Sequence, residues 1–188
     1  MKKTFLVFIF FVICVTVTNA QFYKSFLPSG AFTDSLQKIV SSFADNYYSI
    51  QGDMISSAED GDTYVSDMSV PGAKNTVIYR FHSTRDTTAS WQATLYKGED
   101  FKEAAKIYKN TFRYVSKAHF TKSGYTISFA GFMEDPNESL RFTSSVLKAD
   151  SGNNAYKKYV AEVEIVNSFT GWEVHLNLHN KKDDRDKY

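Results

Sequence analysis

The chain has 188 residues, a formal net charge of +1 and no strongly basic segment, which argues against a nucleic-acid-binding protein. Hydrophobic residues make up 43% of the chain, and it contains only 3 Pro and 9 Gly, so the composition argues against intrinsic disorder. A chain of this size can bury a hydrophobic core without disulfide bonds.

The first 20 residues have the pattern of a secretory signal peptide. Lys2 and Lys3 precede an apolar run over residues 5–17, and small residues lead to a cleavage position after Ala20. The run is too short to span a bilayer, which needs about 20 apolar residues, so we expect no transmembrane anchor after cleavage. Cys14, the only cysteine, lies in this run, and the mature chain would hold no thiol. The sequence therefore predicts export to the periplasm or the medium.

Residues 21–188 are expected to form a single α+β domain, with halves at about 31–97 and 98–180 and a charged tail over 181–188. In the first half, Leu36, Val40, Phe43 and Tyr47 share one helical face, which predicts a helix over 34–47 with Thr33 as its N-cap. Alternating apolar residues and turn residues then predict four strands. These strands are expected at 50–56, 64–70, 76–82 and 89–96.

The second half begins with the clearest helix signal in the chain. Asp100 and Glu103 have the spacing of a capping box, and apolar residues from Phe101 to Val115 recur at helical spacing, so a helix is predicted to end near Ala118. Four further strands are expected at 125–133, 140–148, 156–166 and 172–180.

The two halves resemble each other in element order. Gly52-Asp53-Met54 matches Gly131-Phe132-Met133, and Trp91 matches Trp172 at a similar offset. A duplicated α-β4 unit would give this pattern, and so would chance similarity between amphipathic strands. In either case, the sequence predicts an α-β4-α-β4 fold in which two helices pack on one face of an antiparallel sheet.

The pattern of apolar residues in the last two predicted strands also predicts how these strands pair. Apolar residues alternate with polar ones along 172–180, which indicates one buried and one solvated face. Matching the apolar sides of these strands places Ile165 opposite Val174. The same register places Glu164 opposite His175 on the solvated face.

Glu164 and His175 are the candidate chemical pair, either as an acid and a base or as an ordinary cross-strand pair. His175 and His179 are four residues apart, which on a strand separates them by about 13 Å, too far to share a metal ion. This pair is therefore not expected to hold a metal ion, and the sequence as a whole predicts no metal site and no cofactor.

Aromatic residues supply the remaining signal. Tyr96 and Phe132 are expected on the solvated side of their strands, where they could line a ligand groove or a partner surface. The alternative is that such residues belong to the core.

The segments 50–52, 64–72 and 91–108 resemble uncharacterised small secreted proteins of Gram-negative bacteria, and this resemblance implies no particular activity. The chain lacks the common hydrolase, phosphate-loop and dinucleotide motifs. The sequence therefore favours a non-enzymatic binding module for an unknown small ligand or an envelope protein. The alternatives are an envelope assembly or structural component, and a hydrolase that uses Glu164 and His175.

Overall fold

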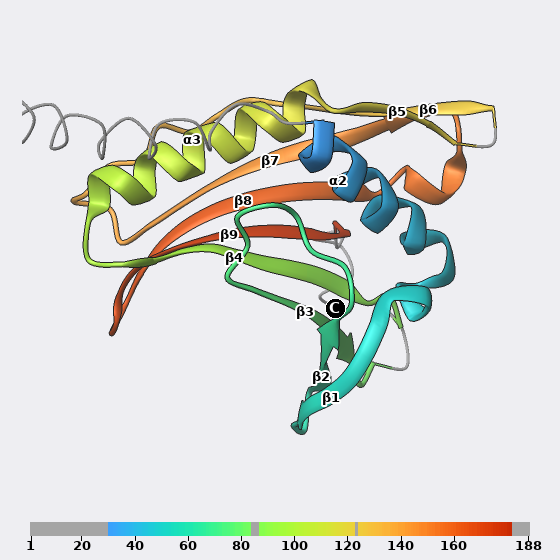
Figure 1. Ribbon diagram of the computed structural model, residues 1–188, viewed down its shortest axis with the longest axis horizontal. Helices are drawn as coiled ribbons and strands as arrows, with labels where there is room; N and C mark the ends of the chain where they lie inside the picture. The colour runs from blue at the N-terminus through green and yellow to red at the C-terminus, as the bar shows by residue number, and fades with distance from the viewer. Residues whose placement is uncertain (1–29, 84–86, 123, 182–188) are drawn as a thin grey trace, which may run out of the picture.

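Two helices pack against a nine-stranded antiparallel sheet in the computed structural model of this protein, which describes residues 30–83, 87–122 and 124–181 (Figure 1). The predicted signal peptide lies outside these residues, as does the charged tail after Lys181. The helices are α2 (Gly30–Ser42) and α3 (Phe101–Lys117). The predicted α+β class, with both helices on one face of an antiparallel sheet, is confirmed.

The sheet has the spatial order β1-β2-β3-β4-β9-β8-β7-β6-β5. The strands of the first half are β1 (Gln51–Ser57), β2 (Gly61–Ser66), β3 (Asn75–Phe81) and β4 (Ser90–Gly98). Those of the second half are β5 (His119–Lys122), β6 (Tyr125–Gly131), β7 (Phe142–Ser151), β8 (Tyr159–Ser168) and β9 (Gly171–Asn180). The short strand β5 was not predicted, so the second half has five strands rather than four. The duplication itself stays a prediction.

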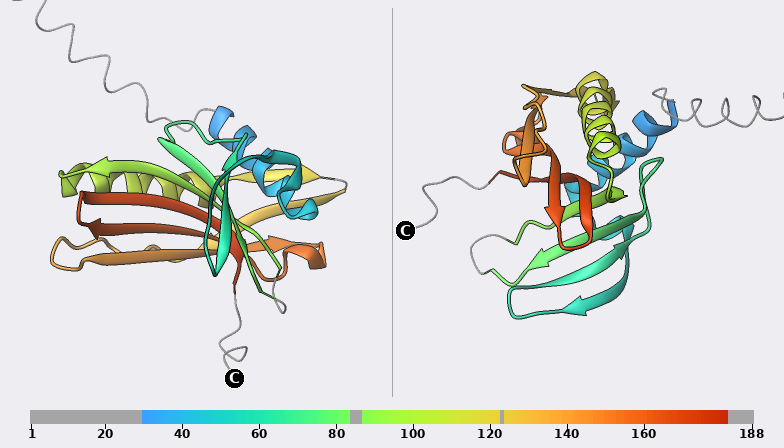
Figure 2. Two further views of the ribbon diagram at one scale, coloured as in Figure 1. Left: turned by 90° about the horizontal axis from the view of Figure 1, so that it is seen from below. Right: turned by 90° about the vertical axis from the view of Figure 1, so that its left-hand side faces the viewer.

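The two halves meet where β4 pairs with β9, so the last strand of each half lies at the centre of the sheet. The first three strands bend away from the plane of the others, and the face opposite the helices is turned toward the viewer in Figure 2, left. We call this side the open face; it carries Tyr79, Gln92, Glu164 and Asn177. The strand neighbours of Gln92, Glu164 and Asn177 on either side are buried in the core.

Helix α3 begins as the sequence predicts. The Asp100 carboxylate accepts hydrogen bonds from the backbone N–H groups of Lys102 and Glu103, which satisfies two donors that the helix itself leaves unpaired. One side of the helix is buried against the sheet, including Tyr108 and Val115. The helix ends at Lys117, one residue before the predicted end.

Helix α2 differs from the prediction at both ends. Thr33 lies inside the helix rather than at its N-cap, and the α-helix ends at Ser42. Asn46 and Tyr47 adopt left-handed backbone conformations, with φ of 57° and 64°, which no α-helix can continue through. The predicted apolar face nevertheless reaches Tyr47, because this side chain is fully buried despite the turn.

The two helices and the sheet share a single hydrophobic core. The rings of Phe32 on α2 and Tyr114 on α3 lie 5.4 Å apart, which ties the helices together above the sheet. Across β8 and β9, Ile165 is opposite Val174 and Glu164 is opposite His175, so the predicted register is confirmed. Within the part of the chain that the structure describes, no helix is both long and apolar enough to cross a membrane.

Candidate functional site

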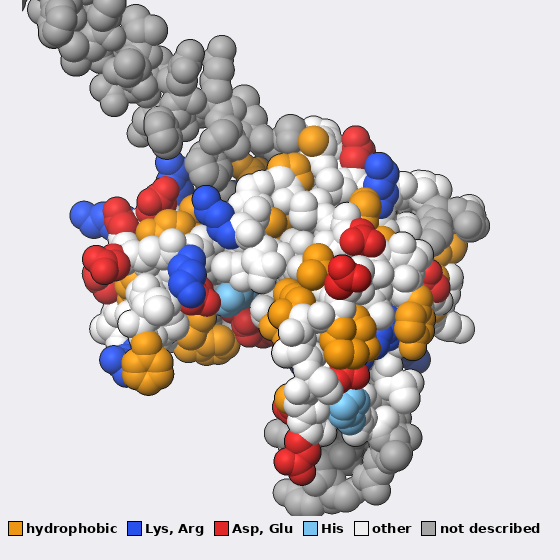
Figure 3. All heavy atoms as spheres, turned by 60° about the horizontal axis from the view of Figure 1, so that its bottom comes forward, with side chains coloured by type: hydrophobic (Ala, Val, Ile, Leu, Met, Phe, Trp, Pro, Cys, Tyr) orange, Lys and Arg blue, Asp and Glu red, His pale blue; other side chains and the backbone are white. Residues whose placement is uncertain are grey.

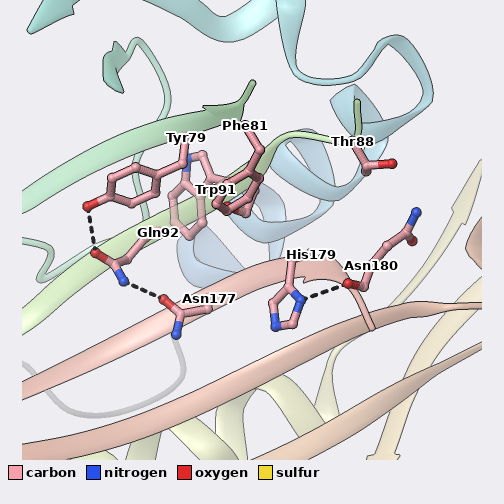
Figure 4. Close-up of a pocket in the computed structure, with 9 residues that line it drawn as sticks. Tyr79, Phe81, Thr88, Trp91, Gln92, Asn177, His179 and Asn180 are labelled. Carbon is pink, nitrogen blue, oxygen red and sulfur yellow. Dashed lines mark hydrogen bonds between the residues drawn. The ribbon is translucent and has the colours of Figure 1, made fainter. Parts of the chain in front are cut away.

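A cavity of about 430 Å³ lies on the open face, where β3, β4 and β9 run side by side (Figure 4). This volume falls within the range of small-molecule sites, about 300–1,000 Å³. The lining residues are Tyr79, Phe81, Thr88, Ser90, Trp91, Gln92, Asn177, His179 and Asn180. The period of two along each strand explains most of this set, because alternate residues point to the same face.

A chain of hydrogen bonds crosses four strands beside the cavity. The Tyr79 hydroxyl donates to Gln92 Oε1 at 3.4 Å, and Gln92 Nε2 donates to Asn177 Oδ1 at 2.8 Å (Figure 4). Asn177 Nδ2 then donates to Glu164 Oε2 at 2.6 Å. Every donor in the chain points toward the carboxylate, so each bond polarises the next in the same direction.

Glu164 ends this chain in a half-buried position. Burial raises the pKa of its carboxyl group, and the neighbouring charge of Glu162 acts in the same direction, whereas the Asn177 hydrogen bond opposes them. The net effect is a raised pKa, because water solvates the ionised form poorly at this position.

His179 reaches from the cavity wall to a carboxylate. Its Nε2 atom lies 3.2 Å from Glu162 Oε2, and Ser144 donates a short hydrogen bond to the other oxygen of Glu162. Burial by itself lowers the pKa of His179, but the bond to Glu162, the Asn180 carbonyl and the charges of Glu162 and Glu164 outweigh it, so the pKa is raised. The hydrogen bond from His179 lowers the pKa of Glu162.

The His179–Glu162 pair predicts a specific pH dependence. Because the pKa of His179 is higher in the folded protein, its stabilising contribution is complete below the unfolded value of about 6.5 and is lost as pH rises through the folded value. We expect the wild type to lose about 0.5–1 kcal/mol relative to His179→Gln between about pH 5.5 and pH 8.5. Urea unfolding of both proteins across this range measures the difference.

His175 provides the matched control for this experiment. Burial lowers its pKa, despite the opposing attraction of Glu173, so its protonation is disfavoured in the folded protein. The wild type should therefore lose stability relative to His175→Gln as pH falls below about 6.5, the opposite direction to His179→Gln. If both variants gave the same slope of stability against pH, at least one of the two assignments would be wrong.

The predicted pair of Glu164 and His175 is opposite in register, but each side chain has another partner. His175 Nε2 lies 3.3 Å from Glu173 Oε2, and its Nδ1 lies 3.3 Å from the Thr94 hydroxyl. Glu164 accepts its hydrogen bond from Asn177 instead. Glu164 and His175 therefore do not form a direct acid–base pair.

Tyr96 is not on the open face, and the prediction of its orientation is wrong. Thr94 is opposite His175, whereas Tyr96 is opposite Val174, so Leu95 is an extra residue in a β-bulge. The bulge reverses the alternation along the rest of β4 and turns Tyr96 into the core, where it is 9% exposed. It takes no part in the cavity.

Phe132 is 91% exposed, but it lies just beyond β6 and does not line the cavity. The strand was expected to continue to Met133, whereas strand pairing ends at Gly131. The backbone N–H of Glu134 donates to the Ser145 hydroxyl, so a side chain replaces the strand's backbone partner there.

The residues that build the cavity were mostly missed by sequence reasoning. Gln92 and Asn177 are 85 positions apart and meet only because β4 pairs with β9. Only the alternation along the last strand pointed to these residues, because it placed Asn177 and His179 on the solvated side. It did not indicate which strand lies next to β9 on the side away from β8.

Charge on the molecule is mixed. On the side shown in Figure 3, acidic and basic side chains are interspersed with hydrophobic ones. Among the residues that the structure describes, no group of three or more His, Cys, Asp or Glu side chains is placed to hold a metal ion.

The geometry of the site is thus a small cavity beside an ordered set of amide, hydroxyl and carboxylate groups. Comparisons with protein-family models, with curated proteins and with solved structures find no match to this chain.

Proposed function

We propose that this protein is an exported, non-enzymatic binding module that holds a small molecule in the cavity on the open face. The observation that carries the proposal is the hydrogen-bonded chain from Tyr79 through Gln92 and Asn177 to Glu164, which fixes polar side chains at the cavity. Side chains held in place before binding lose little conformational entropy when a ligand arrives.

The cavity also combines the two kinds of surface that ligand sites use. Phe81 contributes an exposed apolar ring, while Gln92 and Asn177 contribute polar groups at defined positions. Sites of this type take most of their affinity from apolar contact and their selectivity from a few polar groups.

Native mass spectrometry tests this function on the full precursor expressed in an exporting bacterial host. We expect a reproducible adduct on the wild type that Asn177→Leu lacks, because this substitution removes the central amide of the hydrogen-bonded chain. Asn110→Leu is the matched control. Asn110 lies on α3 and does not line the cavity, so this variant should keep the adduct.

Two other outcomes of the same measurement would contradict the proposal. A dimer or larger species without an adduct would favour an envelope assembly component, for which Phe132 and Phe169 are exposed apolar side chains that a partner could cover. An adduct that persists in Asn177→Leu would place the binding site elsewhere.

A hydrolase is the weaker alternative. The pKa is raised for the Glu164 carboxyl group and lowered for that of Glu162 on the same strand. Two carboxyl groups with diverging pKa values are typical of an acid and a base in a hydrolase. However, Glu162 is bound by His179 and Ser144, while Glu164 is bound by Asn177, and neither carboxylate lines the cavity.

A further inference from the structure

The lining of the cavity indicates an uncharged ligand. Among the residues that the structure describes, the nine that line the cavity include no Asp, Glu, Lys or Arg, and the one that can become a cation, His179, is already paired with Glu162 at 3.2 Å. A charged ligand would lose its hydration on entry without meeting an uncompensated opposite charge. An uncharged ligand avoids this cost.

The amides at the cavity retain hydrogen-bonding capacity after their mutual bonds are formed. Gln92 uses one amide hydrogen toward Asn177 and accepts one bond from Tyr79. A carboxamide has two hydrogens and two acceptor positions on oxygen, so one donor and one acceptor remain. Asn177 likewise donates once and accepts once. A hydroxyl group, which both donates and accepts, complements this combination.

A third amide adds an acceptor without a partner. The Oδ1 atom of Asn180 is buried and has no hydrogen-bond partner within the described part of the chain, although the residue lines the cavity. A buried acceptor in this state is destabilising. Rotation of the amide toward the cavity would let it accept a hydrogen bond from a ligand hydroxyl.

The aromatic ring of Phe81 supplies the apolar side of the site. Phe81 lines the cavity from β3 and is 41% exposed, so its ring offers the aromatic surface that a ligand can reach, whereas Trp91 lines the cavity but is fully buried (Figure 4). The face of an aromatic ring carries negative charge density, so it attracts the weakly positive C–H groups of a saturated ring. A ligand with C–H groups on one face and hydroxyls at its edge satisfies both parts of the lining.

We propose that the cavity binds the pyranose ring of a neutral sugar, either free or at the end of an oligosaccharide. This inference rests on the proposed function and names the ligand class for the same site.

Saturation-transfer NMR and titration calorimetry on the full exported chain test this proposal. The sugar probes are glucose, galactose, mannose and N-acetylglucosamine, with maltose and lactose to distinguish a free sugar from an oligosaccharide end. Choline, citrate and indole serve as cationic, anionic and apolar comparisons. We expect at least one sugar to bind and all three comparisons to fail.

Variants assign the binding to the cavity. Asn177→Leu should weaken sugar binding by about tenfold or more, because it removes hydrogen bonds to the ligand. Phe81→Ser leaves the hydrogen-bonded chain in place and should weaken binding through loss of the ring alone. Asn110→Leu should leave the affinity within about twofold of the wild type.

The remaining outcomes separate the two proposals. Binding of choline, citrate or indole, lost in Asn177→Leu, would overturn the sugar inference and keep the binding function. Sugar binding that survives both Asn177→Leu and Phe81→Ser would overturn this placement of the site. Failure of every probe, together with absence of an adduct in native mass spectrometry, would overturn both proposals.

Discussion

Replacing Trp91 with Ala is expected to lower the free energy of unfolding by about 3–5 kcal/mol. The Trp91 side chain is fully buried on the central strand β4, and its Nε1 atom donates a hydrogen bond to the Ser66 hydroxyl at 2.9 Å. The substitution removes a large apolar volume that the surrounding strands cannot refill, and it removes a hydrogen bond to β2. Urea unfolding followed by circular dichroism should show a lower midpoint with an unchanged slope.

Trp91→Phe is the control that separates volume from hydrogen bonding. It keeps most of the ring volume but loses the N–H donor, so its cost should be about 1–2 kcal/mol. A loss of less than about 1 kcal/mol for Trp91→Ala would contradict the central position of this side chain in the core.

The second large effect is expected at a pair of buried tyrosines. The hydroxyls of Tyr47 and Tyr159 are 2.7 Å apart, and the Tyr47 hydroxyl donates to the Leu178 carbonyl at 3.1 Å. Tyr47→Phe leaves the Tyr159 hydroxyl buried without this partner and should cost about 1–3 kcal/mol. Tyr159→Phe leaves the bond from Tyr47 to Leu178 in place and should cost about 0.5–1.5 kcal/mol. Chemical unfolding of both variants measures which substitution lowers the free energy of unfolding more.

Two further variants test this explanation. Tyr48→Phe alters a neighbouring side chain that is 64% exposed, and its effect should stay within about 0.5 kcal/mol. Replacing both Tyr47 and Tyr159 by Phe leaves no unpaired hydroxyl, so the double variant should cost less than the sum of the single ones. Equal costs for the two single variants would show that the Leu178 bond is unimportant.

Local patterns in the sequence predicted the elements whose determinants lie close together along the chain. The Asp100 cap is followed within three residues by the backbone groups that it binds, and β8 and β9 are joined by a tight turn at 168–171. In both cases, the interacting partners are neighbours in sequence. The predicted start of α3 and the predicted register of the last two strands are correct for that reason.

The errors arise where a distant contact overrides a local pattern. Tyr47 continues the helical spacing of α2, yet its hydroxyl binds Tyr159 and Leu178, more than 100 positions away, and its backbone leaves the helix. The bulge near Leu95 exists only in the pairing of β4 with β9, so no alternation within β4 could place Tyr96 correctly.

The candidate site shows the same division. The prediction that Glu164 and His175 lie opposite each other on the open face is correct, because the register of β8 and β9 is set by the hairpin that joins them. The connection of Asn177 to Gln92 could not be predicted, since it depends on which strand lies on the other side of β9. Alternation reveals the face on which a residue lies and leaves the neighbouring strand undetermined.

The position of β9 has a consequence for how the chain reaches its fold. This strand follows all the others along the sequence, yet it pairs with β4 on one side and β8 on the other. Until it docks, the two halves of the sheet remain separate, and β4 and β8 each present an unpaired edge that invites pairing with another chain. The pairing of β9 with β8 is a local hairpin, whereas its pairing with β4 joins segments that are distant in sequence, and such contacts form slowly. Completion of the sheet, and of the cavity shared by β3, β4 and β9, is therefore a late event, and a chain that stops short of β9 is the form most prone to aggregate.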